Sequence, residues 1–338
     1  MKYSLMCAAM LAAMTSNAVH ANAQCDRNDW MWASFKQSFV TSEGRVVDTA
    51  NKRISHSEGQ GYGMLMAVHY EDKAMFSKLW SWTERHLQRE VDSLFSWKWQ
   101  PQKPHIPDKN NASDGDVLIA WALMRAHSQW PRLGYNAKAK NIVRDLQTSH
   151  MRRVNGETVL LPGTHGFSFG DRTIVNPGYW VYPALASFSK YDKVWNALSD
   201  SGLSILSKNL YGDAKLTPDW LQYSAKGWQP ANSFPSQFSY SNYRIPLYMV
   251  WGNKSHPLNR NFTRWIGKDN AAWIDVISGE KANYPPPAGA RAIAQLVAMA
   301  NGTRSVDQGI SITPQGKDYY SDSLVLLSHM AYKERVCK

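Results

Sequence analysis

Two short acidic stretches carry the residue types that acid–base chemistry needs. In the first, residues 55–64 read SHSEGQGYGM, so that Glu58 stands among closely spaced glycines. Glycines let a bulky ligand approach the backbone, and in that case Glu58 borders a cavity. The same letters also spell a capping box, Ser55 with Glu58 or Ser57 with Gln60, and in that case the glutamate only caps a helix. The residues alone leave both interpretations open.

The second stretch, residues 110–116, reads NNASDGD and leads into an apolar run. Aspartate at a helix N-terminus is commonly a cap. Asp114 and Asp116 together exceed what one cap needs, so one of them is free to face a polar cleft. A glutamate and an aspartate from two helix starts, facing one aromatic cleft, form the carboxylate pair that glycoside hydrolysis requires.

The chain is rich in aromatic residues of the kind that bind sugars. It has 15 Trp and 16 Tyr, and several stand in polar, loop-like contexts: Trp97, Trp99, Trp220, Trp228, Tyr240 and Tyr243. Flat rings in clefts stack on the apolar faces of pyranose rings. Most of the tryptophans are nevertheless expected in the core.

Helical patterns recur along the chain and must position these residues. They cover about 27–40, 60–70, 72–88, 115–130, 136–150, 178–189, 191–208, 243–252, 258–275, 289–300 and 320–334. The run VLIAWALM at 117–124 is apolar all round and predicts a buried helix, whereas 136–150 is amphipathic and faces solvent. Alternation of buried and surface helices predicts one all-α domain with two concentric layers. Strand signals are short, at 158–161 and 173–175, and long functional loops are expected at 91–114, 151–177 and 209–240.

With these motifs the chain resembles glycoside hydrolase family 8, the bacterial endoglucanases, and in particular the cellulases associated with bacterial cellulose synthesis. Residues 57–64 are similar to the family's acid motif, and 112–130 match its signature pattern at every fixed position. The segment FSYSNYRIPLY at 238–248 resembles the third motif. Further family blocks are similar to 176–179, 217–220 and 318–320.

The resemblance implies an (α/α)6 toroid with long cleft-lining loops, in a single catalytic domain over residues 24–338. It implies hydrolysis of internal β-1,4-glucosidic bonds of cellulose or soluble glucans with inversion, without a cofactor or metal. Glu58 takes the general-acid position, and Asp114 takes the family's signature carboxylate, for which we prefer the role of holding the distorted sugar. The residues that the resemblance assigns to substrate binding are Trp97, Tyr179, Tyr240, Arg244 and Tyr320.

One position departs from the family pattern. The third motif usually has an aspartate as general base, and this chain has Ser241 there, followed by Asn242. Neither side chain accepts a proton usefully near neutral pH, and general-base catalysis contributes about 10²–10⁴-fold. Two interpretations keep the protein an enzyme. Either another carboxylate supplies the base, with Asp114, Asp116 and Asp219 as the candidates, or Ser241 and Asn242 only position the water and the enzyme is slow. The remaining interpretation is a catalytically impaired glucan-binding protein that assists cellulose synthesis or biofilm assembly.

The N-terminus reads as a cleavable signal peptide, residues 1–23. Lys2 precedes an apolar stretch that is too short to span a bilayer, and Ala21-Asn22-Ala23 is an A-x-A cleavage site. We therefore expect a periplasmic or secreted protein, with cleavage after Ala23 and no membrane association afterwards.

Two of the three cysteines remain after such cleavage. Cys7 leaves with the signal, while Cys25 and Cys337 stand near the two ends of the mature chain. In an oxidising compartment this pair predicts a disulfide that joins the termini, with two unpaired thiols as the alternative.

The basic charge does not indicate nucleic acid. The net charge is +11, but Lys and Arg are scattered without a run longer than two. This pattern is typical of a solvated basic surface. We expect a monomer whose partner is a β-1,4-glucan chain.

Overall fold

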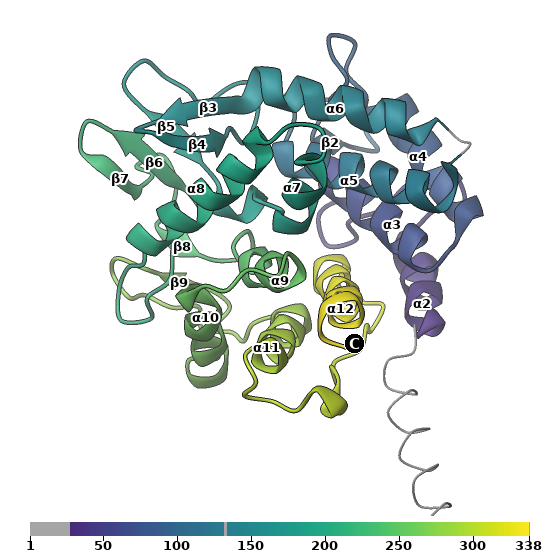
Figure 1. Cartoon of the computed structure of the whole chain (residues 1–338). Helices are drawn as coiled ribbons and strands as arrows, with labels where there is room; N and C mark the ends of the chain where they lie inside the picture. The colour runs from purple at the N-terminus through teal and green to yellow at the C-terminus, as the bar shows by residue number, and fades with distance from the viewer. Residues whose placement is uncertain (1–27, 132–133, 338) are drawn as a thin grey trace, which may run out of the picture.

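Helices dominate the computed structural model, which describes residues 28–131 and 134–337 (Figure 1). Nearly all of them lie where the sequence pattern predicts, within a few residues. Their bounds are α2 (Asp29–Phe39), α3 (Ser57–His69), α4 (Lys73–Leu87), α5 (Ser113–Gln129), α6 (Tyr135–His150), α7 (Tyr182–Phe188), α8 (Val194–Lys208), α9 (Arg244–Trp251), α10 (Pro257–Lys268), α11 (Ala288–Ala300) and α12 (Tyr319–Ala331).

Burial separates these helices into two layers. α3, α5, α7, α9 and α12 are buried on nearly every side, because their sequences are apolar or small all round. α2, α4, α6, α8, α10 and α11 bury one face and cover them from outside. The all-α, two-layer prediction is confirmed, with the apolar run 117–124 in the middle of the inner helix α5.

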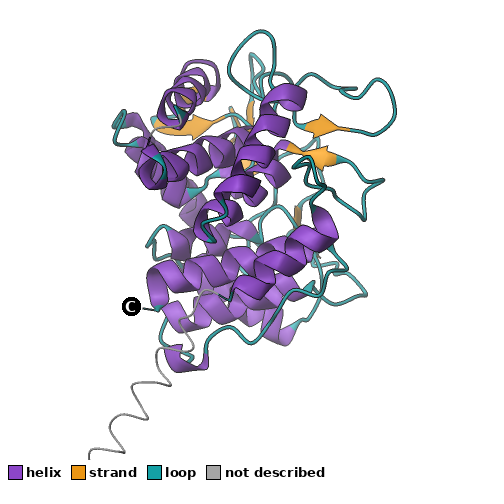
Figure 2. Ribbon diagram, turned by 90° about the vertical axis from the view of Figure 1, so that its right-hand side faces the viewer, coloured by secondary structure: helices purple, strands orange, loops and turns teal. Residues whose placement is uncertain are grey.

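The strands are short, antiparallel and confined to the connections between helices. They are β1 (Ser55–His56), β2 (Lys98–Trp99), β3 (Met151–Val154), β4 (Glu157–Leu160), β5 (Thr173–Val175), β6 (Leu221–Ser224), β7 (Gly227–Pro230), β8 (Gln237–Phe238) and β9 (Ile274–Asp275). The two predicted strands correspond to β4 and β5. Figure 2 shows long loops along one side of the helical bundle.

Two predicted helices are wrong in extent. Instead of one helix over 178–189, a 3₁₀ turn (Pro177–Tyr179) precedes α7, which starts at Tyr182. Pro183 explains the break, since proline in a helix interior removes one hydrogen bond and clashes with the preceding turn. The helix predicted over 258–275 ends at Lys268, because Asn270 adopts a positive φ of 47° and the chain then enters β9.

One partly buried carboxylate ties three inner helices together near their C-terminal ends. Glu334, in the π-helical turn Tyr332–Val336, accepts hydrogen bonds from Arg125 Nη2 at 2.6 Å and Trp251 Nε1 at 2.7 Å. Its Oε1 also lies 3.2 Å from His69 Nδ1. Burial opposes ionisation, but these three partners lower the pKa of Glu334 to about 2. α3, α5 and α9 are thus pinned at one end, which leaves their N-terminal ends to carry functional residues.

Some predictions concern residues at the edge of the described chain. The signal peptide and Cys25 lie outside the described residues. Cys337 is disulfide-bonded, and its pairing with Cys25 stays a prediction. Within residues 28–131 and 134–337, no helix is long and apolar enough to cross a membrane.

Candidate active site

Glu58 lies in the first turn of α3, at the N-terminal end of an inner helix. The capping-box interpretation is wrong, because the N-cap is His56 and no side chain caps the helix. Gln60 instead turns into the core, where it accepts from Val46 N at 2.6 Å and donates to Thr83 Oγ1 at 2.8 Å. The glutamate is therefore not used in capping.

Arg244, the first residue of α9, joins the two predicted carboxylates. Its Nη1 donates to Glu58 Oε1 and, at 2.8 Å, to Asp114 Oδ2. Burial alone would lower the pKa of the guanidinium, but the carboxylates of Glu58 and Asp114 hold it well above its usual range. Glu58, Asp114 and Arg244 thus form one charged cluster from the starts of three inner helices.

The shared nitrogen keeps the two carboxylates close together. Glu58 and Asp114 bind the same Nη1, so their oxygens lie within two hydrogen-bond lengths of each other. An inverting glycosidase needs roughly 6.5–9.5 Å between its acid and base carboxyls, with water between them. Burial raises the pKa of Asp114 to about 6, Arg244 opposes the rise, and Glu58 adds to it. This arrangement fits a residue that holds the sugar better than a general base.

Ser241 occupies the departed base position as a neutral hydroxyl in contact with Arg244. Its Oγ accepts from Arg244 Nη2 at 3.0 Å and donates to Asn176 Oδ1 at 3.0 Å. Asn176 Oδ1 also accepts from Gly178 N at 2.9 Å, at the start of the 3₁₀ turn. A Cβ at Gly178 would collide with the Ser241 carbonyl, which explains glycine there. The hydroxyl is thus fixed beside the charged cluster.

Asp219 holds the turn that carries Ser241. Its Oδ1 accepts from the backbone N–H groups of Ser239 at 3.0 Å and Asn242 at 3.2 Å, and its Oδ2 accepts from the Ser239 hydroxyl. Burial raises the pKa of Asp219 to about 6, despite these hydrogen bonds. A third carboxylate, Asp219, therefore lies next to the turn of Ser241 and does not bind Arg244 directly.

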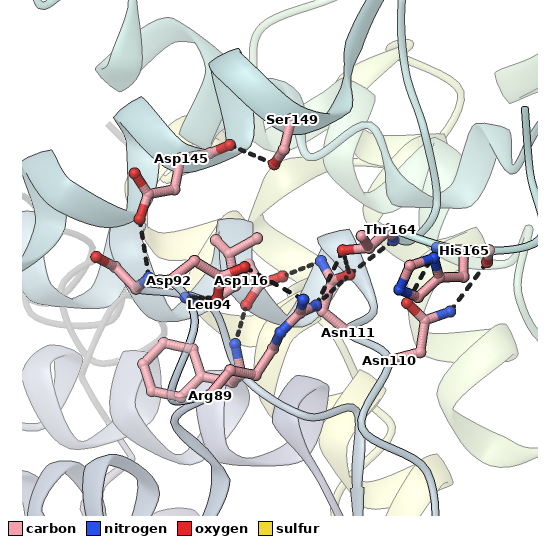
Figure 3. A network of polar contacts seen from close by, with 12 residues as sticks. Arg89, Asp92, Leu94, Asn110, Asn111, Asp116, Asp145, Ser149, Thr164 and His165 are labelled. Atoms are coloured by element: carbon pink, nitrogen blue, oxygen red, sulfur yellow. Dashed lines mark hydrogen bonds and ion pairs between the residues drawn. The ribbon is translucent and has the colours of Figure 1, made fainter.

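Asp116 belongs to a separate polar network (Figure 3). It is fully buried and accepts from Phe95 N at 2.8 Å and Asn111 Nδ2 at 2.7 Å, while Asn111 Oδ1 accepts from Arg89. Residues two apart on a helix point in different directions, so Asp116 turns away when Asp114 faces the charged cluster. Burial raises the pKa of Asp116 to about 8. These contacts place Asp116, one of the candidate bases, outside the charged cluster.

Three predicted aromatic residues surround the charged cluster. The Arg244 guanidinium carbon lies 5.5 Å from the centre of the Tyr179 ring. Tyr240 is 40% exposed, and its backbone carbonyl accepts the Tyr320 hydroxyl. The rings of Tyr240 and Tyr320 meet edge to face, with centres 5.8 Å apart. The structure thus brings together residues from three distant segments, as the family motifs imply.

Trp97 stands beside the start of α3. Its carbonyl accepts from Ser57 N at 3.0 Å, and its ring stacks on His56 with centres 6.5 Å apart. Its indole N–H donates to Asp108 Oδ2 at 2.9 Å. The ring is therefore fixed at the start of the helix that carries Glu58.

Sequence reasoning missed two residues of the site. The Tyr62 hydroxyl donates to Glu58 Oε1 at 2.8 Å and lies 3.2 Å from the Tyr248 hydroxyl. Residues four apart share a helix face, so the spacing of Glu58 and Tyr62 was a usable signal. Asn176 lies in one of the family blocks, but no local pattern predicts its contact with Ser241, 65 positions away. No cluster of three or more His, Cys, Asp or Glu in the described part of the chain is arranged to hold a metal ion.

Comparisons with known proteins agree with this geometry. The model of glycosyl hydrolases family 8 matches residues 2–334. A probable endoglucanase of Novacetimonas hansenii is 35% identical over 96% of both chains, and an endoglucanase of Cellulomonas uda is 36% identical over 78% of this chain and 76% of its own.

Solved structures extend the match to three dimensions. The family 8 endoglucanase Cel10 from Klebsiella pneumoniae superposes with a TM-score of 0.83 at 35% identity, covering 90% of this chain and 99% of its own. The endo-β-1,4-glucanase CMCax from Acetobacter xylinum gives 0.81 at 35% identity, covering 90% and 97%. These structures share an (α/α)6 fold, which confirms the predicted architecture. This chain belongs to glycoside hydrolase family 8.

Proposed function

We propose that the protein is an endo-β-1,4-glucanase that cleaves cellulose or its soluble derivatives with inversion. The observation that carries the proposal is the charged cluster, in which one buried arginine orients Glu58 and Asp114 beside the ring of Tyr179 and close in sequence to the exposed Tyr240. Relatives at 35–36% identity are named endoglucanases, which supports β-glucan as substrate and favours hydrolysis over binding alone.

Glu58 acts as general acid in this proposal. Its Oε1 accepts from both Tyr62 and Arg244, so the proton that it delivers to the leaving glycosidic oxygen resides on Oε2. Asp114, held by Arg244 and by the N–H of Gly115 at 2.8 Å, grips the hydroxyl groups of the distorted sugar. Hydrogen bonds of that kind strengthen in the transition state.

Asp219 acts as general base. Among the candidates, Asp114 shares a nitrogen with the acid and Asp116 lies in another network, whereas Asp219 supports the turn of Ser241. A pKa of about 6 suits a base that works near neutral pH. The water loses a proton to Asp219 while its oxygen bonds to the anomeric carbon. The glycosidic bond breaks at the same step, and its oxygen takes the proton of Glu58.

The first experiment measures hydrolysis of soluble carboxymethyl cellulose. The parent should be active, and Glu58→Gln should lose about 10²–10⁴-fold in kcat, as expected for general acid catalysis. Glu280→Gln is the matched control, because Glu280 is exposed and far from the charged cluster in sequence. NMR of fresh products should show the α-anomer. An inactive parent that gains activity in Ser241→Asp would instead identify the glucan-binding protein.

The second experiment tests the base. Asp219→Asn retains an oxygen for the N–H groups of Ser239 and Asn242, so the turn should survive while kcat falls by about 10²–10⁴-fold. Azide, a nucleophile that needs no base, should restore part of the activity of Asp219→Asn. Adding Ser241→Asp to that variant should do the same. Loss of activity without either rescue would make Asp219 a structural residue only.

The proposal includes export and a monomeric state. The A-x-A site supports cleavage after Ala23, so the mature protein should begin at Gln24 and reside in the periplasm or outside the cell. N-terminal sequencing of the exported protein and light scattering of the purified protein test the two statements.

A further inference from the structure

We infer that Tyr284 extends the sugar-binding cleft beyond Tyr240 and contacts an additional glucose unit of the glucan chain. The inference rests on the proposed function and adds a binding position that lies outside the family motifs. Tyr284 precedes three prolines in the segment between β9 and α11. It is 47% exposed, close to the 40% of Tyr240.

The two exposed tyrosines form one surface. Their hydroxyl groups lie 3.3 Å apart, although the residues are 44 positions apart in the chain. Tyr240 directly precedes Ser241, whose hydroxyl binds Arg244, and the hydroxyl of Tyr240 contacts that of Tyr284, so the two tyrosines continue from the charged cluster. A chain bound at the cluster and continuing past Tyr240 meets Tyr284 next.

The backbone around Tyr284 is fixed relative to the cleft. Its carbonyl accepts from Ala272 N at 2.9 Å, and the carbonyl of Ala272 accepts the hydroxyl of Tyr243. Tyr243 is buried and packs edge to face against Tyr240, with ring centres 5.6 Å apart. Prolines 285–287 further restrict the segment. A preorganised ring loses little conformational entropy when a ligand binds.

The chemistry of this surface suits a sugar. Each ring offers a flat apolar face for the C–H groups of a pyranose, and each hydroxyl both donates and accepts hydrogen bonds. A glucose unit presents both kinds of group, and it can replace the contact between the two tyrosine hydroxyls with bonds of its own.

The test compares cello-oligosaccharides of increasing length, from cellotriose to cellohexaose. Tyr284→Ala should lower kcat/KM for cellohexaose by about three- to tenfold, the range of one aromatic contact, and leave cellotriose within about twofold. Tyr284→Phe, which keeps the ring, should lose less. Tyr191→Ala is the matched control, since Tyr191 is 36% exposed and its hydroxyl binds Asn136 at 2.7 Å, after the C-terminal end of α7. The control should behave as the parent at every length.

A binding measurement separates failure of this inference from failure of the proposed function. Calorimetry with cellohexaose in a Glu58→Gln background reports affinity without hydrolysis, and Tyr284→Ala should weaken it by the same three- to tenfold. Active parent enzyme with an unchanged length dependence in Tyr284→Ala overturns the inference and leaves the glucanase intact. Absence of both hydrolysis and binding in the parent overturns both.

Discussion

Replacing Glu334 by glutamine should destabilise the fold without touching the chemistry. Glu334 binds residues near the C-terminal ends of α3, α5 and α9, whereas Glu58, Asp114 and Arg244 stand in the first turns of the same helices. Glutamine keeps the shape and can accept hydrogen bonds, but it removes the negative charge.

The magnitude follows from the pKa. Lowering the pKa of Glu334 from 4.5 to about 2 stabilises the folded state by about 3 kcal/mol at neutral pH. Because the folded-state pKa is the lower one, this contribution is complete above about pH 4.5 and is lost as the pH falls towards 2. With an unfolding entropy of about 2.1 cal/mol/K per residue, the same loss lowers the Tm of this chain by about 4 °C.

Urea unfolding at pH 7, 4 and 3 measures the effect. Glu334→Gln should lose about 3 kcal/mol at pH 7, and the difference from the parent should shrink at pH 3. Glu280→Gln is again the control and should stay within about 0.5 kcal/mol, as exposed surface substitutions do. The kcat of folded Glu334→Gln should equal that of the parent. A penalty no larger than that of Glu280→Gln, or one that does not change with pH, would refute the role of this carboxylate.

Three further predictions concern the site and the chain ends. Gly115→Ala should lower the free energy of unfolding by about 1–3 kcal/mol in urea titrations and remove most of the activity in kinetic assays, because its Cβ would collide with the start of α3. Gly267→Ala is the control: the position has open space around it, so the change should leave stability equal or higher. The pH profile of kcat/KM should fall below about pH 6, since the sugar-holding aspartate and the base must both be ionised, and a profile flat to pH 4 would contradict their pKa values. Mass spectrometry of unreduced peptides should find Cys25 linked to Cys337, and a free thiol at Cys337 would exclude that pair.

The fold was predictable where local sequence determines it. The run 117–124 is apolar all round, and only an inner helix can bury every side of it. Strand pairings between distant segments have no such local pattern. Ser55 pairs with Trp99, for example, but each strand has only two residues, which is too short for a recognisable alternation. The end of α10 was missed although Asn270 is a residue type that adopts the left-handed turn found there.

The residues that form the site were predictable, but the residue pattern alone did not predict the role of each one. Two aspartates at one helix start implied that one faces a cleft. The residue pattern alone could not choose between them, and only the resemblance to the family singled out Asp114. The choice depends on Asn111 and Phe95, which satisfy Asp116 from another segment and leave Asp114 for Arg244. Likewise, Gln60 looked like a capping residue until its partners proved to lie in the core.

The hydrogen bonds of Ser241 limit how well an aspartate can restore the base. The serine hydroxyl accepts from Arg244 and donates to Asn176, whereas a carboxylate only accepts. Aspartate would keep the arginine and place a second acceptor against Asn176 Oδ1. Rotation of the Asn176 amide removes that clash, but it also removes the acceptor of the Gly178 N–H, at the turn that carries Tyr179.

Rescue of Asp219→Asn by Ser241→Asp should therefore be partial. The mismatched contact displaces either the new carboxylate or the turn that carries Tyr179, so kcat should stay roughly tenfold or more below that of the parent. The unsatisfied buried group also costs about 1–3 kcal/mol of stability. The single variant Ser241→Asp should carry the same structural cost, visible as a lower Tm. Full recovery of kcat with an unchanged Tm would mean that Asn176 reorients freely, and its two hydrogen bonds would then not explain why serine is accommodated at position 241.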